Sequence, residues 1–168
     1  DVMAFAAFGG SLECVEFLHK IGVPWSREVC IYAAQSGSCN TLKRLYELGC
    51  PLNEDACSEA ALHGYLEVLK FLRNDLNCPW DSLTPALASL GGNKEVLEWC
   101  FENDCPVCAH SPVNAARNGH CECLKILYEH NAPLNGHILR VARMYKQHEC
   151  LKFAMKNNCP EDDGLSEE

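Results

Sequence analysis

A repeat with a period of 27 residues limits the possible folds of this chain more than any other feature of the sequence. Prolines mark the period, in steps of 27, 28, 27, 27 and 27 residues: Pro24, Pro51, Pro79, Pro106, Pro133 and Pro160. Glycines keep the same interval: Gly10, Gly37, Gly64, Gly92 and Gly119. The two series agree when one extra residue is placed in the loop between Leu72 and Pro79. Self-similarity of this kind is typical of a repeat array, in which one supersecondary unit is stacked many times.

Residues 49–74 show what one unit contains. Ala60 and Ala61 belong to a first helix, and Gly64 forms the turn to a second helix. The second helix has an apolar side at helical spacing, made of Leu66, Val68, Leu69 and Leu72. The alanine pair recurs and then decays along the chain: Ala6-Ala7, Ala33-Ala34, Ala60-Ala61, Ala88-Ser89, Ala115-Ala116 and Ala142-Arg143. Small paired residues allow the second helix to approach closely, so each unit is predicted to be a helix-turn-helix.

Each unit also carries signals for where its helices begin and end. Residues that favour the N-cap follow the proline by two positions: Ser26, Asn53, Asp81 and Asn135. In two units we expect a later start, with Thr84 or Ser111 as the N-cap and Pro85 or Pro112 at the first helical position. Residues that tolerate a left-handed conformation precede each proline by two positions: Gly22, Gly49, Asn77, Asp104, Asn131 and Asn158. The second helix is predicted to end there.

A single unit buries too few apolar side chains to offset the entropy of ordering its backbone, so neighbouring units must stabilise one another. The predicted fold is therefore an all-α solenoid of about six helix-turn-helix repeats. The expected units are 1–23 (partial), 24–50, 51–78, 79–105, 106–132 and 133–159. The last is interpreted as a cap because Arg143, Lys146 and Ala154 replace the usual alanine, glycine and leucine. Residues 160–168 are expected to form an acidic tail.

By register, Asp1 falls where Glu28 falls in the next unit. The first helix is therefore expected to lack its opening turn. The sequence leaves open whether further repeats lie upstream.

Charge and hydropathy exclude two classes of partner. The chain has 23 acidic and 14 basic residues and a formal net charge of −9, which disfavours a phosphate backbone as the principal partner. No apolar run approaches the roughly 18 residues of a membrane span, and no signal peptide opens the sequence. We therefore expect neither a nucleic acid nor a membrane as the partner.

The cysteines indicate packing rather than a disulfide framework. The chain has 13, and twelve occupy repeat positions where other copies carry Val, Leu, Ala, Thr or another Cys. A free cysteine behaves as a small, readily buried hydrophobe. The thiols are therefore predicted to be free, as is typical of a reducing compartment, the cytoplasm or the nucleus.

The segments AALHGYLEVLKFLRN (60–74) and AARNGHCECLKILYEHNAPLN (115–135) resemble the core of the ankyrin repeat, and Thr84-Pro85 and Ser111-Pro112 are similar to its T-P opening. This resemblance implies a right-handed solenoid that binds proteins on a concave face lined by its first helices. Ankyrin units have about 33 residues. The shortfall here lies between the proline and the alanine pair, so the β-hairpin finger is expected to be trimmed to a short loop. Loops such as Cys78-Pro79-Trp80 and Cys50-Pro51-Leu52 are similar to those of divergent arrays from protists and large DNA viruses.

Candidate partner-binding residues occupy the fourth, eighth and eleventh positions after each proline, which share one side of the first helix. They are Glu28, Tyr32, Gln35, Asp55, Glu59, Leu62, Leu83, Leu87, Leu90, His110, Asn114 and Arg117, followed in the last full unit by His137, Val141 and Met144. The surface is predicted to be acidic at one end, apolar in the middle and basic beyond, and to take a protein or peptide. An alternative interpretation places the eighth position partly in the core, which leaves Leu83 and Leu90 as the anomalous residues.

No Gly-rich phosphate loop, metalloprotease helix or nucleophile elbow appears, so we predict no enzyme activity and no cofactor. Cys105 and Cys108 form a CxxC, and with His120 and Cys121 they make a remote alternative, a zinc or thiol-redox module. A further alternative is a structural subunit embedded permanently in a larger assembly rather than a monomer. Trp25 and Trp80 follow the repeat proline and are interpreted as packing between units.

Overall fold

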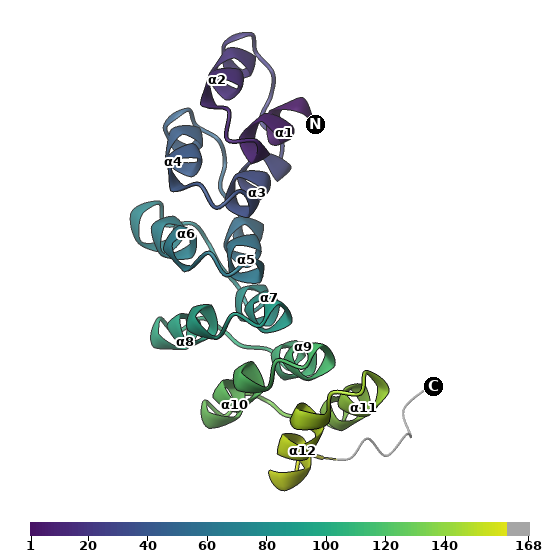
Figure 1. Cartoon of the computed structure of the whole chain (residues 1–168). Coiled ribbons are helices and arrows are strands. Elements are labelled where there is room, and N and C mark those ends of the chain that lie inside the picture. Colours follow the sequence, from purple (N-terminus) through teal and green to yellow (C-terminus); the bar gives the residue numbers. More distant parts are fainter. Residues whose placement is uncertain (161–168) are drawn as a thin grey trace, which may run out of the picture.

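The repeat folds into helix pairs, each joined by a short turn and stacked on the pair before it (Figure 1). The computed structural model describes residues 1–160, so the predicted acidic tail lies almost wholly outside the described residues. The first helices of the pairs are α1 (Val2–Phe8), α3 (Glu28–Gln35), α5 (Glu54–Leu62), α7 (Leu83–Gly91), α9 (His110–Asn118) and α11 (His137–Met144). The second helices are α2 (Leu12–Lys20), α4 (Cys39–Glu47), α6 (Leu66–Lys70) with the π-helical η1 (Phe71–Asp75), α8 (Lys94–Glu102), α10 (Cys121–Glu129) and α12 (His148–Lys156). The prediction of an all-α repeat solenoid is confirmed, and residues 1–160 contain no strand.

The expected left-handed residues adopt positive φ at both kinds of turn. All five turn glycines have φ between 66° and 77°, and Lys146, which replaces the sixth, has φ 56°. The residues that end the second helices also adopt positive φ, with values of 50° at Asn77 and 56° at Asp104 and Asn131. Because proline follows two residues later, the helix cannot continue beyond this point.

The helix starts differ from the prediction in the two units that have a second proline. α7 begins at Leu83 and α9 at His110, so Thr84 and Ser111 lie inside their helices rather than at the N-cap. Pro85 and Pro112 are each the third residue of the helix. They are tolerated because the first turn of a helix has amides with no partner within the helix. Asp81 lies two residues before the start of α7, and its carboxylate accepts a hydrogen bond from the amide of Leu83, the first residue of the helix (2.9 Å).

The extra residue of the second proline step, from Pro51 to Pro79, is absorbed within the helix rather than in the loop. Phe71–Asp75 forms one π-helical turn at the end of α6, and the amide of Leu76 donates to the carbonyl of Phe71 (3.2 Å). The amide of Cys78 then donates to the carbonyl of Leu72 (2.8 Å). A π-turn accommodates one additional residue in a helix. Asn77 and Pro79 therefore keep their places in the repeat.

The first helices stack directly on one another, α1 on α3 and so on to α11, and they form the inner side of a curved array (Figure 1). The paired small residues lie in this stack, and Ala33, Ala34, Ala60 and Ala61 are completely buried. A single apolar core runs from Met3 to Cys159. Each unit is thus stabilised by its neighbours, as is typical of solenoids.

The two terminal units differ from the expectations in detail. α1 has seven residues, and Asp1 is its N-cap, because the side chain of Asp1 accepts hydrogen bonds from the amides of Met3 and Ala4. The expectation that the first helix lacks its opening turn is therefore wrong. In the last unit Arg143 and Lys146 are exposed, but Ala154 is completely buried. The truncated side chain at 154 therefore belongs to the core and not to an outer face.

Candidate binding surface on the first helices

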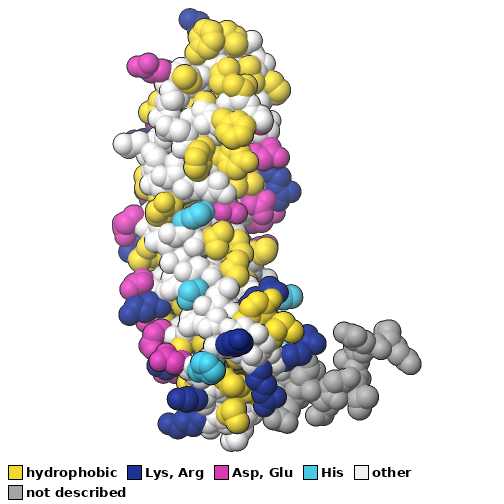
Figure 2. Space-filling model, turned by 45° about the vertical axis from the view of Figure 1, so that its right-hand side comes forward, with side chains coloured by type: hydrophobic (Ala, Val, Ile, Leu, Met, Phe, Trp, Pro, Cys, Tyr) yellow, Lys and Arg dark blue, Asp and Glu magenta, His cyan; other side chains and the backbone are white. Residues whose placement is uncertain are grey.

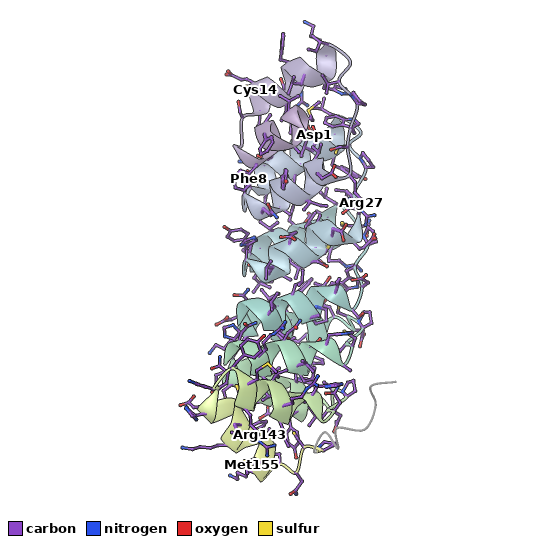
Figure 3. All side chains as sticks on the ribbon, turned by 90° about the vertical axis from the view of Figure 1, so that its right-hand side faces the viewer. Asp1, Phe8, Cys14, Arg27, Arg143 and Met155 are labelled. Carbon is purple, nitrogen blue, oxygen red and sulfur yellow. The ribbon has the colours of Figure 1, made fainter. Side chains whose placement is uncertain are left out.

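The predicted binding residues all lie on the accessible side of the first helices, which is turned toward the viewer in Figure 3. Of the twelve on α3, α5, α7 and α9, four are exposed: Glu28, Leu83, His110 and Arg117. The other eight are half-buried: Tyr32, Gln35, Asp55, Glu59, Leu62, Leu87, Leu90 and Asn114. Residues at the eighth position are half-buried in every unit from Tyr32 onward, in line with the alternative interpretation of that position. We call this surface the first-helix face.

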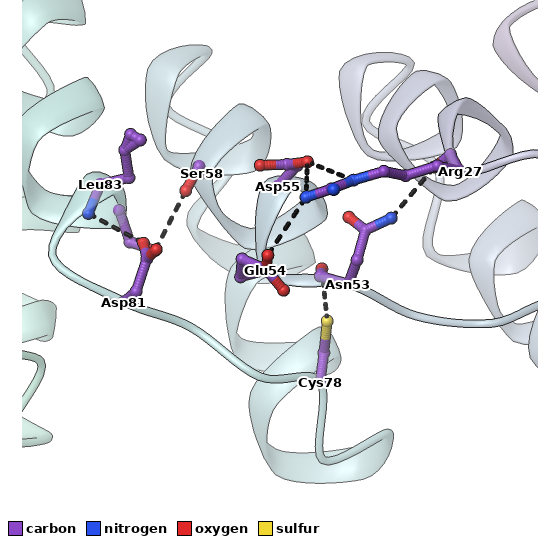
Figure 4. Close-up of polar contacts among 9 residues, drawn as sticks. Arg27, Asn53, Glu54, Asp55, Ser58, Cys78, Asp81 and Leu83 are labelled. Atoms are coloured by element: carbon purple, nitrogen blue, oxygen red, sulfur yellow. Dashed lines mark hydrogen bonds and ion pairs between the residues drawn. The ribbon is translucent and has the colours of Figure 1, made fainter.

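Carboxylates at the acidic end of the first-helix face are engaged by groups of the neighbouring unit. The guanidinium of Arg27 lies 2.7 Å from Asp55 and 3.1 Å from Glu54 (Figure 4). The amide of Gln35 donates to the carboxylate of Glu59 (3.0 Å). These contacts join α5 to the unit of α3, and Arg27 offsets part of the negative charge. The acidic end is therefore less able to attract a basic partner than the residue types alone indicate.

The middle of the face is apolar. Leu83 is 42% exposed, and Leu87 and Leu90 on the same helix are half-buried. Beneath them the hydroxyls of Ser58 and Thr84 meet in the buried contact of α5 with α7 (3.4 Å). The leucines thus stand on a well-packed pair of helices, which fixes their positions.

Two aromatic residues of this surface were not among the predicted site residues. Phe5 and Phe8 on α1 are 65% and 52% exposed, and their ring centroids lie 5.9 and 6.2 Å from that of Tyr32 on α3. They precede Tyr32 and Gln35 by one period of 27 residues. The series of candidate positions was counted from Pro24 and so omitted the partial first unit. Extension of the period back to residue 1 would have included both residues.

The far end of the face is basic. The guanidinium of Arg117 donates to the hydroxyl of Tyr145 (3.1 Å) and lies over its ring, 5.1 Å from the centroid. His110 and Arg143 are exposed nearby on α9 and α11. Figure 2 shows hydrophobic side chains gathered over the upper part of this side of the molecule, and Lys, Arg and His over its lower part. From α1 to α11 the face is therefore aromatic first, then carries the carboxylates of α5 and the leucines of α7, and ends basic.

The residues of the remote zinc alternative do not converge. The thiol of Cys105 lies 3.5 Å from the carbonyl of Asp81, whereas His120 contacts the carbonyl of Leu90 (3.1 Å). Cys108 lies 3.7 Å from the Nδ1 atom of His110. Within residues 1–160 no group of three or more His, Cys, Asp or Glu side chains is arranged to hold a metal ion.

The cysteines pack as small apolar residues. All 13 are free, ten are buried, Cys39 and Cys108 are half-buried and Cys14 is exposed. The Sγ atoms of Cys30 and Cys50 lie 3.3 Å apart in the core. Burial raises the pKa of Cys123 to about 11 and that of Cys150 to about 12. These thiols therefore remain protonated at neutral pH, which does not suit a thiolate nucleophile.

The tryptophans contact residues of the array. Trp25 stacks on the ring of His19 (4.8 Å between centroids). Trp80 lies edge-on to Trp99 (5.5 Å), and the guanidinium of Arg73 lies over its ring at 4.4 Å. Both packing interpretations agree with these contacts. No helix within residues 1–160 is long and apolar enough to cross a bilayer.

The stacked helix pairs with left-handed turns define a helical repeat solenoid. The ankyrin repeat domain of human ASB11 has a similar fold, with a TM-score of 0.57 over 95% of this chain and 70% of that domain, at 19% sequence identity. The chain therefore has an ankyrin-like repeat fold. No family model and no curated protein matches its sequence.

Proposed function

We propose that this chain is a non-enzymatic scaffold that binds a protein or peptide on its first-helix face. The observation that carries this proposal is a set of accessible apolar side chains on the first helices α1, α3 and α7: Phe5, Phe8, Tyr32, Leu83, Leu87 and Leu90. Apolar surface that is accessible and rimmed by polar groups is typical of protein interaction sites. The ankyrin-like fold agrees with this role.

The mode of binding follows from the stack. The first helices from α3 to α9 are each fixed between two others, so this part of the face is preformed and association needs to order only the partner. The partner is expected to present aromatic or aliphatic residues to the apolar part. It is expected to place acidic residues near the basic His110 and Arg117. A basic residue of the partner is less needed near Asp55, because Arg27 already offsets that carboxylate.

Net charge and free thiols indicate the class of partner and the compartment of such a scaffold. A net charge of −9 disfavours nucleic acid, and free buried thiols suit a reducing compartment, the cytoplasm or the nucleus. The C-P-W loop at Cys78-Pro79-Trp80 groups the chain with divergent, finger-shortened ankyrin arrays. The repeat array is proposed to occupy residues 1–159, with residues 133–159 as its cap.

A selection from a phage-displayed random peptide library tests the proposed face. Peptides selected on the wild-type chain are expected to lose at least about tenfold in affinity for the double variant Leu83→Glu with Leu90→Glu, since charges would then occupy the apolar contact. The matched control is Tyr128→Glu with Met155→Glu, two equally drastic changes on exposed positions of the second helices. Circular dichroism must show both variants folded. Peptides that bind the leucine variant as tightly as the wild type would remove the proposal.

The control positions also bear on the alternative of a permanently embedded subunit. Tyr46, Tyr128 and Met155 occupy one repeat position on α4, α10 and α12 and are all exposed. They make a sparse apolar row on the convex side. Loss of binding in the second-helix variant alone would favour that alternative.

A further inference from the structure

The amino-terminal end of the stack presents an apolar face. Val2 on α1 and Phe17 on α2 are 60% and 61% exposed, and they border an open hollow of about 530 Å³ that Ala6, Cys14 and Leu18 also line. Glu13 is the one charged residue of its lining. We call this surface the end face. It is distinct from the first-helix face, although Phe5 contributes to both.

Three residues of the end face, Val2, Ala6 and Cys14, occupy repeat positions that are buried in every later unit. The position of Val2 is completely buried at Val29, Ala56, Thr84, Ser111 and Ile138. The position of Cys14 is at most 3% exposed at Thr41, Val68, Val96, Cys123 and Cys150. Ala6 is half-buried, whereas its equivalents are completely buried at Ala33, Ala60, Ala88, Ala115 and Ala142. Each later unit has another helix pair stacked against this side.

The opposite end of the stack has different chemistry. Positions that meet the following unit carry small residues, such as Ala4 and Ala7 on α1, which are completely buried against α3 and α2. In α11 the same two positions carry Arg140 and Arg143, and both side chains are exposed. Arginine at these positions makes the last unit unsuited to packing against a following unit. The end face has no such polar substitution.

We propose that the end face binds a further helix pair of this repeat type, stacked in register and continuous with the amino end of the array. Five internal interfaces show what covers these positions: a preceding unit that presents small residues like Ala7, Ala34 and Ala61. The end face continues those interfaces in position and in residue type. A helix pair with small residues on its following side would bury Val2, Ala6 and Cys14 as the preceding units bury their equivalents.

The test adds such a unit to the full chain. A copy of residues 28–54 is fused directly ahead of Asp1, which puts Asp1 in the register of Asp55. Native-state alkylation by iodoacetamide is followed at Cys14 by peptide mass spectrometry. The rate at Cys14 is expected to fall at least about tenfold, because alkylation would then require opening of the added unit.

The matched control is the same fusion with Ile31→Arg and Ala34→Arg in the added copy, which reproduces the arginines of the last unit. Cys14 in this control should react at the rate of the unfused chain. Equal rates in the two fusions would overturn the proposal. So would an unfused chain that sediments as a dimer with Cys14 already protected, since a second copy would then be the occupant.

Discussion

The backbone amide of Leu76 donates a hydrogen bond to the carbonyl of Phe71, five residues earlier, at 3.2 Å. This bond marks the place where the second full unit, residues 51–78, holds one residue more than its neighbours. The π-turn takes up the additional residue on the solvent side, where Asn74 and Asp75 are exposed. The core positions on either side, Leu72 and Cys78, remain completely buried.

Deletion of Asn74 should therefore be tolerated. The shortened helix would return to the 27-residue period, and the free energy of unfolding is expected to stay within about 0.5 kcal/mol of the wild-type value. Deletion of Glu102, the equivalent position in the next unit, has no π-turn to relieve it. It would displace the buried Cys105 and the left-handed Asp104, and should lower stability by about 2 kcal/mol or more. Urea unfolding of the two variants measures the difference, and equal losses would contradict the explanation of η1.

Replacement of Lys146 by glycine should stabilise the chain. Lys146 has φ 56° at a position where the other five units have glycine. Relief of a left-handed conformation is worth about 1–2 kcal/mol, and the greater unfolded-state entropy of glycine offsets part of it, so the expected gain is about 0.5–1 kcal/mol. Lys152→Gly, on the exposed side of α12, should instead lose about 1 kcal/mol. The midpoints of urea unfolding give both signs, and a loss at Lys146→Gly would show that the turn is not strained.

Ala33→Leu should destabilise the chain by about 1–3 kcal/mol, because the completely buried methyl group of Ala33 leaves no space between neighbouring units. Ala6 occupies the same repeat position in the first unit but is only half-buried. Ala6→Leu should therefore change stability by no more than about 0.5 kcal/mol. Thermal unfolding of both variants compares one substitution with and without a covering unit. Equal effects would argue against stacking as the cause of the burial.

Alkaline pH should destabilise the chain through its buried thiols. Burial raises the folded-state pKa of Cys123 to about 11 and of Cys150 to about 12, above the value of about 8.5 for an exposed thiol. Their stabilising contribution is complete below the unfolded-state pKa and is lost as the pH rises through about 9 to 12. Between pH 8 and pH 10.5 the pair is expected to account for about 1–2 kcal/mol, discounted for partial burial. Cys123→Val with Cys150→Val, which matches Val68 and Val96 at the same position, should lose correspondingly less. Urea unfolding at the two pH values checks the difference, and an identical alkaline loss would exclude these thiols as its source.

The parts of the fold that depend on one residue type at one position could be predicted from the sequence. Asn77 and Asp104 were expected to adopt positive φ because few residue types tolerate it, and both do. The prediction that Pro85 is the first residue of its helix was wrong. A proline fits any position in the first turn of a helix, so it does not fix where the helix begins.

The candidate surface could be predicted as a set of positions but not as a pattern of contacts. The period placed Leu83 and Arg117 on the accessible side of their helices. It could not show that Arg27 lies 2.7 Å from Asp55, because that pairing depends on how two units sit against each other in space. Phe5 was missed for a simpler reason, since it lies in the partial unit that precedes the first repeat proline.

The central claim is that all the helix pairs share one core and stabilise one another, which requires the array to unfold as a unit. Two single-tryptophan variants test it most directly. One keeps Trp25 in the loop before α3 (Trp80→Phe with Trp99→Phe), and the other keeps Trp99 on α8 (Trp25→Phe with Trp80→Phe). In each variant, urea unfolding is followed by tryptophan fluorescence and by far-ultraviolet circular dichroism. The two transitions are expected to coincide in both variants, and a fluorescence midpoint clearly separated from that of the helix signal would contradict a single shared core.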